Sequence, residues 1–168
     1  MSIIRNIVRA KYGDNISTDD MTSGKFLSSF EPEELAKICM YDIDPDFPSR
    51  MAPGGIVVGG MNFGCGSSRE TAPIALKACN VKAILACEAA RIFYRNCINV
   101  GVPVLECPAA FEGFDLDDDI EINLETGLVN NLTKGKTYQA SPIPPFLMDI
   151  VSEGGLLAVL EKRIAEQR

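Results

Sequence analysis

The sequence predicts a single α/β domain, in which a mostly parallel sheet with flanking helices is extended by a β-hairpin toward the C-terminus. Short apolar runs alternate with helical patterns between residues 55 and 106, which is typical of βαβ units with parallel strands. A half-buried alternating pattern and a turn follow between residues 118 and 130. The 168 residues suffice for a proper core, and no linker divides them, so residues 1–168 are expected to form one domain.

The N-terminal part is expected to contain one strand, a long irregular region and one helix. Residues 3–10 are rich in β-branched side chains and predict the first strand. Polar turn formers dominate residues 12–21, and residues 22–30 continue as a loop. A helix is expected over residues 31–40, because a proline and acidic residues occupy its first turn. Residues 44–48 predict a turn.

Three buried strands and two helices are expected in the βαβ region. Continuous apolar runs predict the strands at residues 55–60, 81–87 and 102–106. Helical patterns between them predict helices over residues 71–79 and 88–97. These short connections imply that the strands lie side by side in one parallel sheet.

The C-terminal part changes character. Residues 118–124 alternate as a half-buried strand, and the Glu-Thr-Gly turn at 125–127 leads back into residues 128–130, which predicts a hairpin. Helices are expected over residues 145–151 and 156–164, separated by a pair of glycines.

The composition is that of a folded protein with an acidic balance. Hydrophobic residues make up 46% and charged residues 23% of the chain, which is ordinary for a globular domain. The net charge of −7 argues against nucleic acid or an anionic membrane as a partner, because both require a basic face. We expect a cytoplasmic protein, since no apolar run approaches a membrane span and the N-terminus lacks a signal-peptide layout.

Six cysteines and the absence of histidine limit the chemistry of the chain. No two cysteines form the close CxxC pair that zinc sites generally need, so we expect no metal site. Several cysteines lie in apolar runs, where they act as small hydrophobic residues in a reducing compartment. Without histidine, acid–base chemistry must use Ser, Tyr, Lys, Cys or a carboxylate.

The candidate functional site is the stretch from Met61 to Glu70, between a strand end and a helix start. Gly64 and Gly66 permit the unusual backbone angles of a tight turn and leave room for a ligand. Free N–H groups and the positive end of the helix dipole favour an anion there. Arg69 adds a planar fork suited to a carboxylate. The stretch therefore predicts a small anion site that contains a potential nucleophile or base.

A structural role for the same residues remains open at this point. Ser67 and Glu70 have the spacing of a capping box, in which serine closes the helix and glutamate reaches back. Pro73 favours a later helix start near Thr71, because proline is costly beyond the first turn. That start would leave residues 67–69 on the entry turn with their side chains free.

Four motifs, in order along the chain, carry a resemblance to a known family. They are Gly13–Ile16 with Thr18-Asp19, then Asn62–Glu70, Ala72–Leu76 and Ala90–Asn96. On these residues the chain resembles the small subunits of the isopropylmalate isomerase and homoaconitase group over essentially its whole length. These subunits are the detached swivelling domain of the aconitase superfamily, and the resemblance implies that β/β/α fold here.

The resemblance implies a hydro-lyase subunit that isomerises a hydroxy-diacid by dehydration and rehydration, here 2-isopropylmalate to 3-isopropylmalate in leucine biosynthesis. It implies activity only with a large subunit, which would carry a [4Fe–4S] cluster acting as a Lewis acid. No cofactor is expected in this chain. The sequence leaves self-association of the small subunit open.

Residue roles also follow from the resemblance. Ser67, as an alkoxide, would be the base, while Ser68 and Arg69 would bind the substrate carboxylate. Asp19 would support the site from the opposite loop. Because an unperturbed serine is a poor base, backbone N–H groups, a helix N-terminus and arginine would have to stabilise the alkoxide.

Five further residues are expected to support the turn. The supporting residues are Asn62, Gly64, Gly66, Arg91 and Asn96. Arg91 and Asn96 would brace the serine turn from the following helix, although solvated or capping roles fit these two polar residues equally well.

We expect the loop of residues 25–29 to determine the substrate specificity. This loop (Lys25, Phe26, Leu27, Ser28 and Ser29) matches the place where family members contact the variable side chain of the substrate. Homoaconitase-like members tend to place arginine there, whereas this chain has Ser28 and Ser29, with Lys25 as the only nearby cation. An unpaired third carboxylate would be costly in a closed site. This favours an alkyl-branched substrate such as isopropylmalate or dimethylmalate, unless Lys25 reaches the extra carboxylate.

Alternative functions remain open, because the chain departs from the family pattern at two places. Thr71 stands where relatives commonly carry His or Gln, and Glu88-Ala89 replaces a more usual Ser-Phe. The alternatives are the small subunit of 2,3-dimethylmalate dehydratase or of homoaconitase, and a non-catalytic binding module with the same fold. A nucleotide site is disfavoured, because the glycine turn contains only half of a dinucleotide fingerprint.

Overall fold

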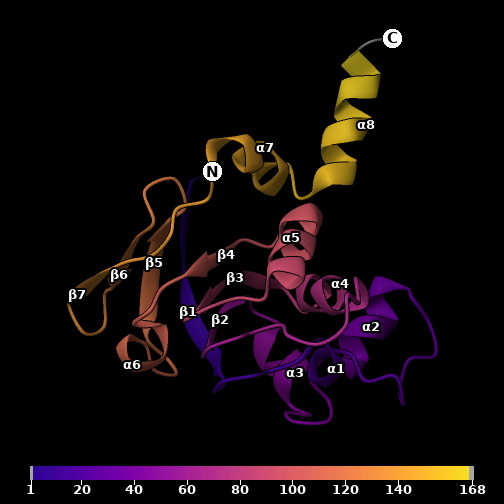
Figure 1. Cartoon of the computed structure of the whole chain (residues 1–168), viewed down its shortest axis with the longest axis horizontal. Helices are drawn as coiled ribbons and strands as arrows, with labels where there is room; N and C mark the ends of the chain where they lie inside the picture. The colour runs from indigo at the N-terminus through magenta and orange to yellow at the C-terminus, as the bar shows by residue number, and fades with distance from the viewer. Residues whose placement is uncertain (1, 167–168) are drawn as a thin grey trace.

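A seven-stranded sheet forms the centre of the structure, a computed structural model that describes residues 2–166 (Figure 1). The strands lie in the order β4-β3-β2-β1-β5-β6-β7. One half pairs in parallel and consists of β1 (Ile3–Lys11), β2 (Gly55–Gly59), β3 (Val81–Ala86) and β4 (Val104–Glu106). The other half pairs in antiparallel fashion and consists of β5 (Asp119–Asn123), β6 (Leu128–Asn131) and β7 (Lys136–Gln139).

Helices connect the parallel strands and cover the sheet. Those between β1 and β2 are α1 (Thr18–Met21), α2 (Pro32–Ile38) and α3 (Phe47–Met51). The crossovers from β2 to β3 and from β3 to β4 are α4 (Thr71–Ala78) and α5 (Arg91–Val100). The remaining helices are α6 (Ala110–Gly113), α7 (Pro145–Ser152) and α8 (Leu156–Glu166), the last of which projects from the body in Figure 1.

The core lies on both faces of the parallel strands, which explains why their sequences are continuously apolar. Val57 and Ile84 pack with residues from α1 to α5 on one face. Their strand neighbours Ile56, Val58 and Leu85 point to the other face, toward α6 and the antiparallel strands. Burial on both sides holds these strands in place. The carboxyl end of β2 leads to α4, and the carboxyl end of β3 leads to α5.

The predicted fold class is confirmed, with several local differences. The helix expected over residues 88–97 begins only at Arg91, because the backbone of residues 87–90 forms hydrogen bonds with residues 59–63, at the end of β2 and in the turn after it. The turn expected at residues 44–48 runs into α3, where Pro48 occupies the first helical turn. The turn-rich segment 12–21 contains α1, and neither α6 nor β7 was predicted from the sequence.

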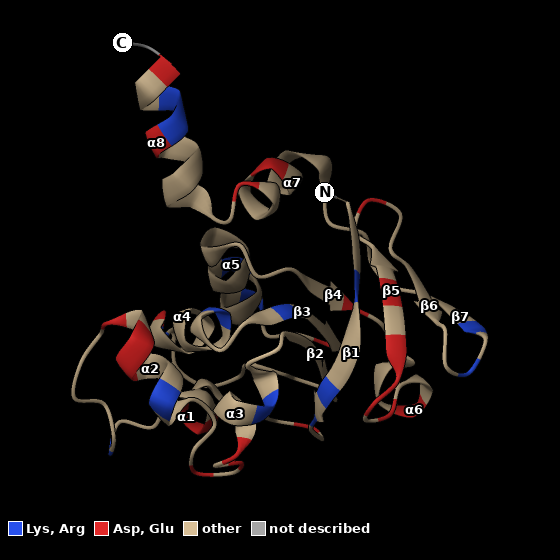
Figure 2. Cartoon of the chain, turned by 180° about the vertical axis from the view of Figure 1, so that it is seen from behind, with Lys and Arg blue, Asp and Glu red and all other residues tan. Residues whose placement is uncertain are grey.

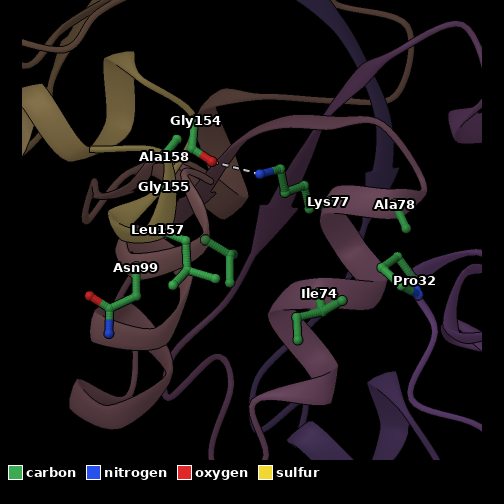
Figure 3. A pocket seen from close by; sticks show the side chains of 10 residues that line it. Pro32, Ile74, Lys77, Ala78, Asn99, Gly154, Gly155, Leu157 and Ala158 are labelled. Atoms are coloured by element: carbon green, nitrogen blue, oxygen red, sulfur yellow. Dashed lines mark hydrogen bonds between the residues drawn. The ribbon is translucent and has the colours of Figure 1, made fainter. Parts of the chain in front are cut away.

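Two glycines with positive φ angles, Gly154 and Gly155, separate α7 from α8. A hollow of ≈ 480 Å³ lies beside this break, between α4, α5 and α8, and its lining is mainly apolar (Figure 3). Lys77 at its edge donates to the Gly154 carbonyl at 2.6 Å. Within residues 2–166, no helix combines the length and apolar character needed to cross a membrane.

Candidate functional site

The glycine turn between β2 and α4 is held on one side by the segment that leads into α1. The Gly64 N–H donates to the Ile16 carbonyl at 2.7 Å, and the Thr18 N–H donates to the Cys65 carbonyl at 2.9 Å. The side chain of Asn62 donates to Asn15 Oδ1 at 3.0 Å. These contacts join two segments that are nearly 50 residues apart in the sequence, so the turn and α1 form one unit.

On its other side the turn packs against the start of α5. The Phe63 N–H donates to the Glu88 carbonyl, and the Ala90 N–H donates to the Phe63 carbonyl. The rings of Phe63 and Phe93 meet edge to face, 5.8 Å apart. Gly64 lies directly over Phe93, with no room for a side chain between them.

The first turn of α4 shows which interpretation of the serine motif is correct. The helix begins at Thr71, and its N-cap Glu70 makes no side-chain cap. Ser67 therefore does not close this helix, and the capping box interpretation is wrong. The alternative, a helix start near Thr71, is confirmed. Ser67 and Ser68 are both exposed on the entry turn.

Ser67 faces a threonine from α1. The Thr18 hydroxyl donates to the Ser67 carbonyl at 2.9 Å, and Thr18 Oγ1 lies 3.2 Å from Ser67 Oγ. Thr18 is only 1% exposed, so a buried hydroxyl lies beneath the exposed serine.

Arg69 is held by two residues of the α1 region. Its Nη1 atom lies 2.8 Å from Asp19 Oδ1 and donates to the Thr22 carbonyl at 2.9 Å. The Thr22 hydroxyl in turn lies 3.0 Å from that of Thr71 at the start of α4. The guanidinium is thus positioned beside the serine turn, and roughly a third of its side chain is exposed to an incoming anion.

A hollow of ≈ 560 Å³ opens next to Arg69 and is bordered by part of the predicted substrate loop. Leu27, Phe30 and Ile74 supply apolar walls, while Arg69, Glu70 and Thr71 supply polar ones. The other residues of the loop do not line this hollow. Lys25 and Ser28 are exposed, Phe26 packs its ring on Tyr41 at 5.1 Å, and the Ser29 hydroxyl accepts from the Glu31 N–H.

The supporting residues divide into two groups. Asn62 and Gly66 adopt positive φ angles of 55° and 95°, and together with Gly64 they set the path of the turn. Arg91 is exposed and borders a different hollow, with Glu88 and Glu106, and Asn96 lies further along α5. Among the hydrogen bonds of residues 2–166, neither joins the serine turn, so the expected brace stays a prediction.

Sequence reasoning did not single out Thr18, Thr22 and Phe93 as site residues. Thr18 belongs to the Thr18-Asp19 motif, but its neighbour at the serine turn lies 49 residues away. Phe93 lies within the Ala90–Asn96 motif, but its packing against Phe63 and Gly64 joins two separate segments. Thr22 carries no local signal, because hydroxyl residues are common in loops.

The cysteines do not assemble a metal site in the described residues. Within residues 2–166, no three or more His, Cys, Asp or Glu side chains are placed to hold a metal ion. Cys97 is fully buried, and this burial raises the pKa of its thiol, as expected of a neutral core residue.

The arrangement suits an acidic substrate that undergoes proton transfer. A guanidinium and exposed hydroxyls around a glycine turn can bind a carboxylate. The same turn presents the Ser67 hydroxyl, which could exchange a proton with a bound molecule if its alkoxide were stabilised.

Comparisons with known proteins show which chains are similar to this one. The aconitase C-terminal domain family matches residues 40–110. The chain is 49% identical to a 3-isopropylmalate dehydratase small subunit of Caldicellulosiruptor bescii, over 88% of this chain and 89% of that protein. It is 45% identical to an isopropylmalate/citramalate isomerase small subunit of Methanocaldococcus jannaschii, over 98% of this chain and 100% of that protein.

A solved structure resembles the whole fold. The crystal structure of a 3-isopropylmalate dehydratase from Methanocaldococcus jannaschii matches with a TM-score of 0.88 and 40% sequence identity, covering 98% of this chain and 97% of that chain.

Proposed function

The chain belongs to the family of 3-isopropylmalate dehydratase small subunits, and from this we infer that it is the small subunit of a hydro-lyase that converts 2-isopropylmalate to 3-isopropylmalate in leucine biosynthesis. The observation that carries the proposal is the placement of Ser67 and Arg69 on one entry turn, with Asp19 paired to Arg69 at 2.8 Å. This is the set of residues that the proposed reaction requires from the small subunit.

In the proposed reaction, Ser67 is the base. Its alkoxide takes the proton from the carbon next to a carboxylate, the electrons of that C–H bond form the C=C bond, and the hydroxyl on the neighbouring carbon leaves. Hydroxide then adds to the carbon that lost the proton, and Ser67 gives its proton to the carbon that lost the hydroxyl, which regenerates the alkoxide. The hydroxyl has thereby moved by one carbon.

Arg69 and Ser68 would hold the substrate during these steps. A guanidinium binds a carboxylate through two parallel hydrogen bonds, which fixes its plane as well as its position. Asp19 would orient Arg69 through their ion pair, leaving the remaining guanidinium N–H groups for the substrate.

A large subunit would complete the enzyme. We propose that it carries the [4Fe–4S] cluster, which supplies a Lewis acid for the departing hydroxyl. In this proposal the present chain supplies the base and the residues that bind the carboxylate, and the partner supplies the metal.

The walls of the hollow beside Arg69 support an alkyl-branched substrate. Leu27, Phe30 and Ile74 can bury a small branched chain, which is favourable in proportion to its apolar area. Ser28 offers no charge to a third carboxylate. Because one relative is named for citramalate as well as isopropylmalate, citramalate belongs among the substrates to be tested.

The test uses the complex of this chain with its large subunit, with the cluster reconstituted without oxygen. Enoate absorbance is followed for isopropylmalate, dimethylmalate, citramalate, homocitrate and citrate. We expect isopropylmalate to be preferred, and Ser67→Ala to lower turnover at least about 10²-fold without loss of assembly, since a general base contributes that much or more. Ser152→Ala, at an exposed position on α7, is the matched control and should keep full activity.

Each contrary result has a distinct meaning. Preference for homocitrate would mean that Lys25 or the partner binds a third carboxylate, and the loop argument would be wrong. A complex with an intact cluster and no turnover on any substrate would favour a non-catalytic binding module.

A further inference from the structure

We propose that Thr18 is the side chain that stabilises the alkoxide of Ser67, and that it does so by redirecting its hydroxyl proton when the alkoxide forms. The inference rests on the proposed function and extends it to a residue of α1. It is carried by the two contacts of Thr18 Oγ1, at 2.9 Å from the Ser67 carbonyl oxygen and 3.2 Å from Ser67 Oγ.

Counting protons defines the resting state of this pair. A threonine hydroxyl has one proton to donate and two lone pairs that accept. A carbonyl oxygen only accepts, so the proton of Thr18 is committed to the Ser67 carbonyl. The 3.2 Å contact is then formed by the Ser67 hydroxyl donating to Thr18 Oγ1. In this state Ser67 is protonated and its hydroxyl points toward Thr18.

Loss of the Ser67 proton changes which bonds are possible. An alkoxide has no proton to give, so Thr18 can keep its contact only by rotating its own proton from the carbonyl to Ser67 Oγ. Hydrogen bonds to a charged oxygen are shorter and about twice as strong as neutral ones, which favours this rotation. The two acceptors belong to the same residue and both lie within reach of Oγ1, so the switch needs only a turn of the hydroxyl.

The surroundings of Thr18 make it suitable for this role. The residue is 1% exposed, and its own N–H is bonded to the Cys65 carbonyl at 2.9 Å. The hydroxyl oxygen is therefore fixed in position before the reaction, so that only its proton has to turn when the alkoxide forms. The stabilisation is larger for the alkoxide than for the resting hydroxyl, so it should act on kcat more than on binding.

The test replaces Thr18 in the complex of this chain with its cluster-loaded large subunit. Thr18→Val keeps the shape of the side chain and removes the hydroxyl, Thr18→Ala removes it with less steric demand, and Thr18→Ser restores it. The substrate is isopropylmalate, either normal or deuterated at the carbon that loses its proton. Thr137→Val on β7 is the control for the same substitution away from the serine turn, because its hydroxyl bonds to Asn130 and not to Ser67.

We expect Thr18→Val and Thr18→Ala to lower kcat about 10²-fold, the loss found when one oxyanion donor is removed, with KM changed less than about twofold. The deuterium isotope effect on kcat should rise in both, because proton abstraction becomes slower than the other steps. Thr18→Ser should recover most of kcat, and Thr137→Val should leave both kcat and the isotope effect unchanged.

A purely structural role for Thr18 would give a different pattern. The proposal is overturned if the Val and Ala variants keep kcat within about threefold, or if their activity falls with an unchanged isotope effect. It is also overturned if Thr18→Ser fails to rescue a correctly assembled complex. A wild-type complex that turns over isopropylmalate while the variants show one of these patterns would refute the role of Thr18 alone. A wild-type complex with an intact cluster and no turnover would refute the proposed function and, with it, this inference.

Discussion

Single residues at the glycine turn are fixed by contacts on two sides, and Gly64 shows this most directly. Its φ angle is +80°, and a Cβ atom there would collide with Cγ of Phe93. Both the backbone angle and the space thus demand glycine. Because the turn has no freedom to shift away from α5, the neighbouring Ser67 is held in one place.

We predict that Gly64→Ala lowers the free energy of unfolding by at least about 3 kcal/mol, from strain at the positive φ angle together with overpacking against Phe93. Urea unfolding of the chain measures it. Gly154→Ala is a matched control, since Gly154 has a φ angle of +83° and an added methyl group there would have nothing within 4 Å. That variant should lose only about 1 kcal/mol. Equal losses in the two variants would show that the contact with Phe93 does not matter.

At this scale the sequence predicted the residues of the turn itself but not those that meet it from elsewhere. The spacing of Gly64, Gly66, Ser67 and Arg69 indicates a tight turn with an anion site. The contact of Thr18 with Ser67 depends on how two segments pair across 49 residues, which no local pattern encodes. Residues that act through long-range packing are therefore the ones that sequence reasoning missed.

At the scale of elements, the residue at which a helix begins determines whether a nearby serine caps that helix. Ser17 is the N-cap of α1, where its hydroxyl accepts from the Asp20 N–H at 3.1 Å and the Asp20 carboxylate accepts from the Ser17 N–H at 2.7 Å. The chain thus uses a capping box here, whereas the similar spacing of Ser67 and Glu70 does not form one. Two matching patterns with different outcomes show why caps could not be assigned from spacing alone.

Removing the cap of α1 should weaken the short helix that carries Thr18 and Asp19. We predict that Ser17→Ala lowers the free energy of unfolding by about 1 kcal/mol, the usual effect of losing an N-cap hydroxyl. Chemical denaturation measures the loss, with Ser152→Ala as a control at an exposed position without a cap role. A Ser17→Ala variant as stable as the control would mean that packing alone maintains α1.

The elements themselves were predicted well where their pattern was long and periodic. All strands of the parallel half and the helices α2, α4, α7 and α8 lie where apolar runs and helical periods indicated them. The start of α5 was placed three residues too early, because Glu88 and Ala90 use their backbone groups to bond Phe63 in the neighbouring turn. Tertiary pairing overrode local helix propensity there.

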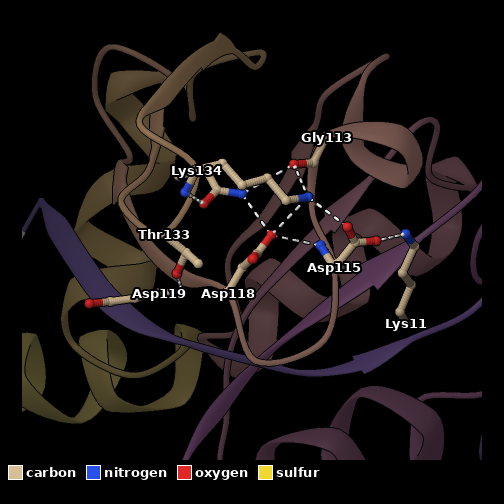
Figure 4. Close-up of polar contacts among 8 residues, drawn as sticks. Lys11, Gly113, Asp115, Asp118, Asp119, Thr133 and Lys134 are labelled. Carbon is tan, nitrogen blue, oxygen red and sulfur yellow. Dashed lines mark hydrogen bonds and ion pairs between the residues drawn. The ribbon is translucent and has the colours of Figure 1, made fainter.

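At the scale of the whole molecule, a charged cluster joins the two halves of the sheet (Figure 4). Asp115 binds Lys11 of β1 and Lys134 of the loop between β6 and β7, each at 2.7 Å. Asp118 is buried and accepts from the Asn131 side chain at 2.7 Å. Lys and Arg residues elsewhere are spread over several elements (Figure 2). This cluster therefore concentrates charge at the junction of the parallel and antiparallel strands.

The cluster makes the free energy of unfolding depend on pH. Hydrogen bonds and charges from Lys11 and Lys134 lower the pKa of Asp115 to about 2. Burial opposes ionisation of Asp118, but the Asp115 N–H, Asn131 and Lys134 together hold its pKa below the ordinary value of 3.8. Because both carboxyls bind protons more weakly when folded than when unfolded, they stabilise the fold above about pH 4 and lose this contribution as the pH falls toward about 2.

We therefore predict that the free energy of unfolding falls between about pH 5 and about pH 2, and that Asp118→Asn flattens this fall. The amide cannot ionise, so the variant lacks the ionic contacts of Asp118 at neutral pH. Its free energy of unfolding therefore falls less than that of the wild type when the pH is lowered. Urea unfolding at a series of pH values compares it with Asp117→Asn, a change at the exposed neighbouring position. Wild type and Asp118→Asn should converge in acid while differing at pH 7. Parallel curves for the two proteins would mean that other carboxyl groups cause the loss of stability and that the junction of the sheet is held by its backbone pairing and apolar core.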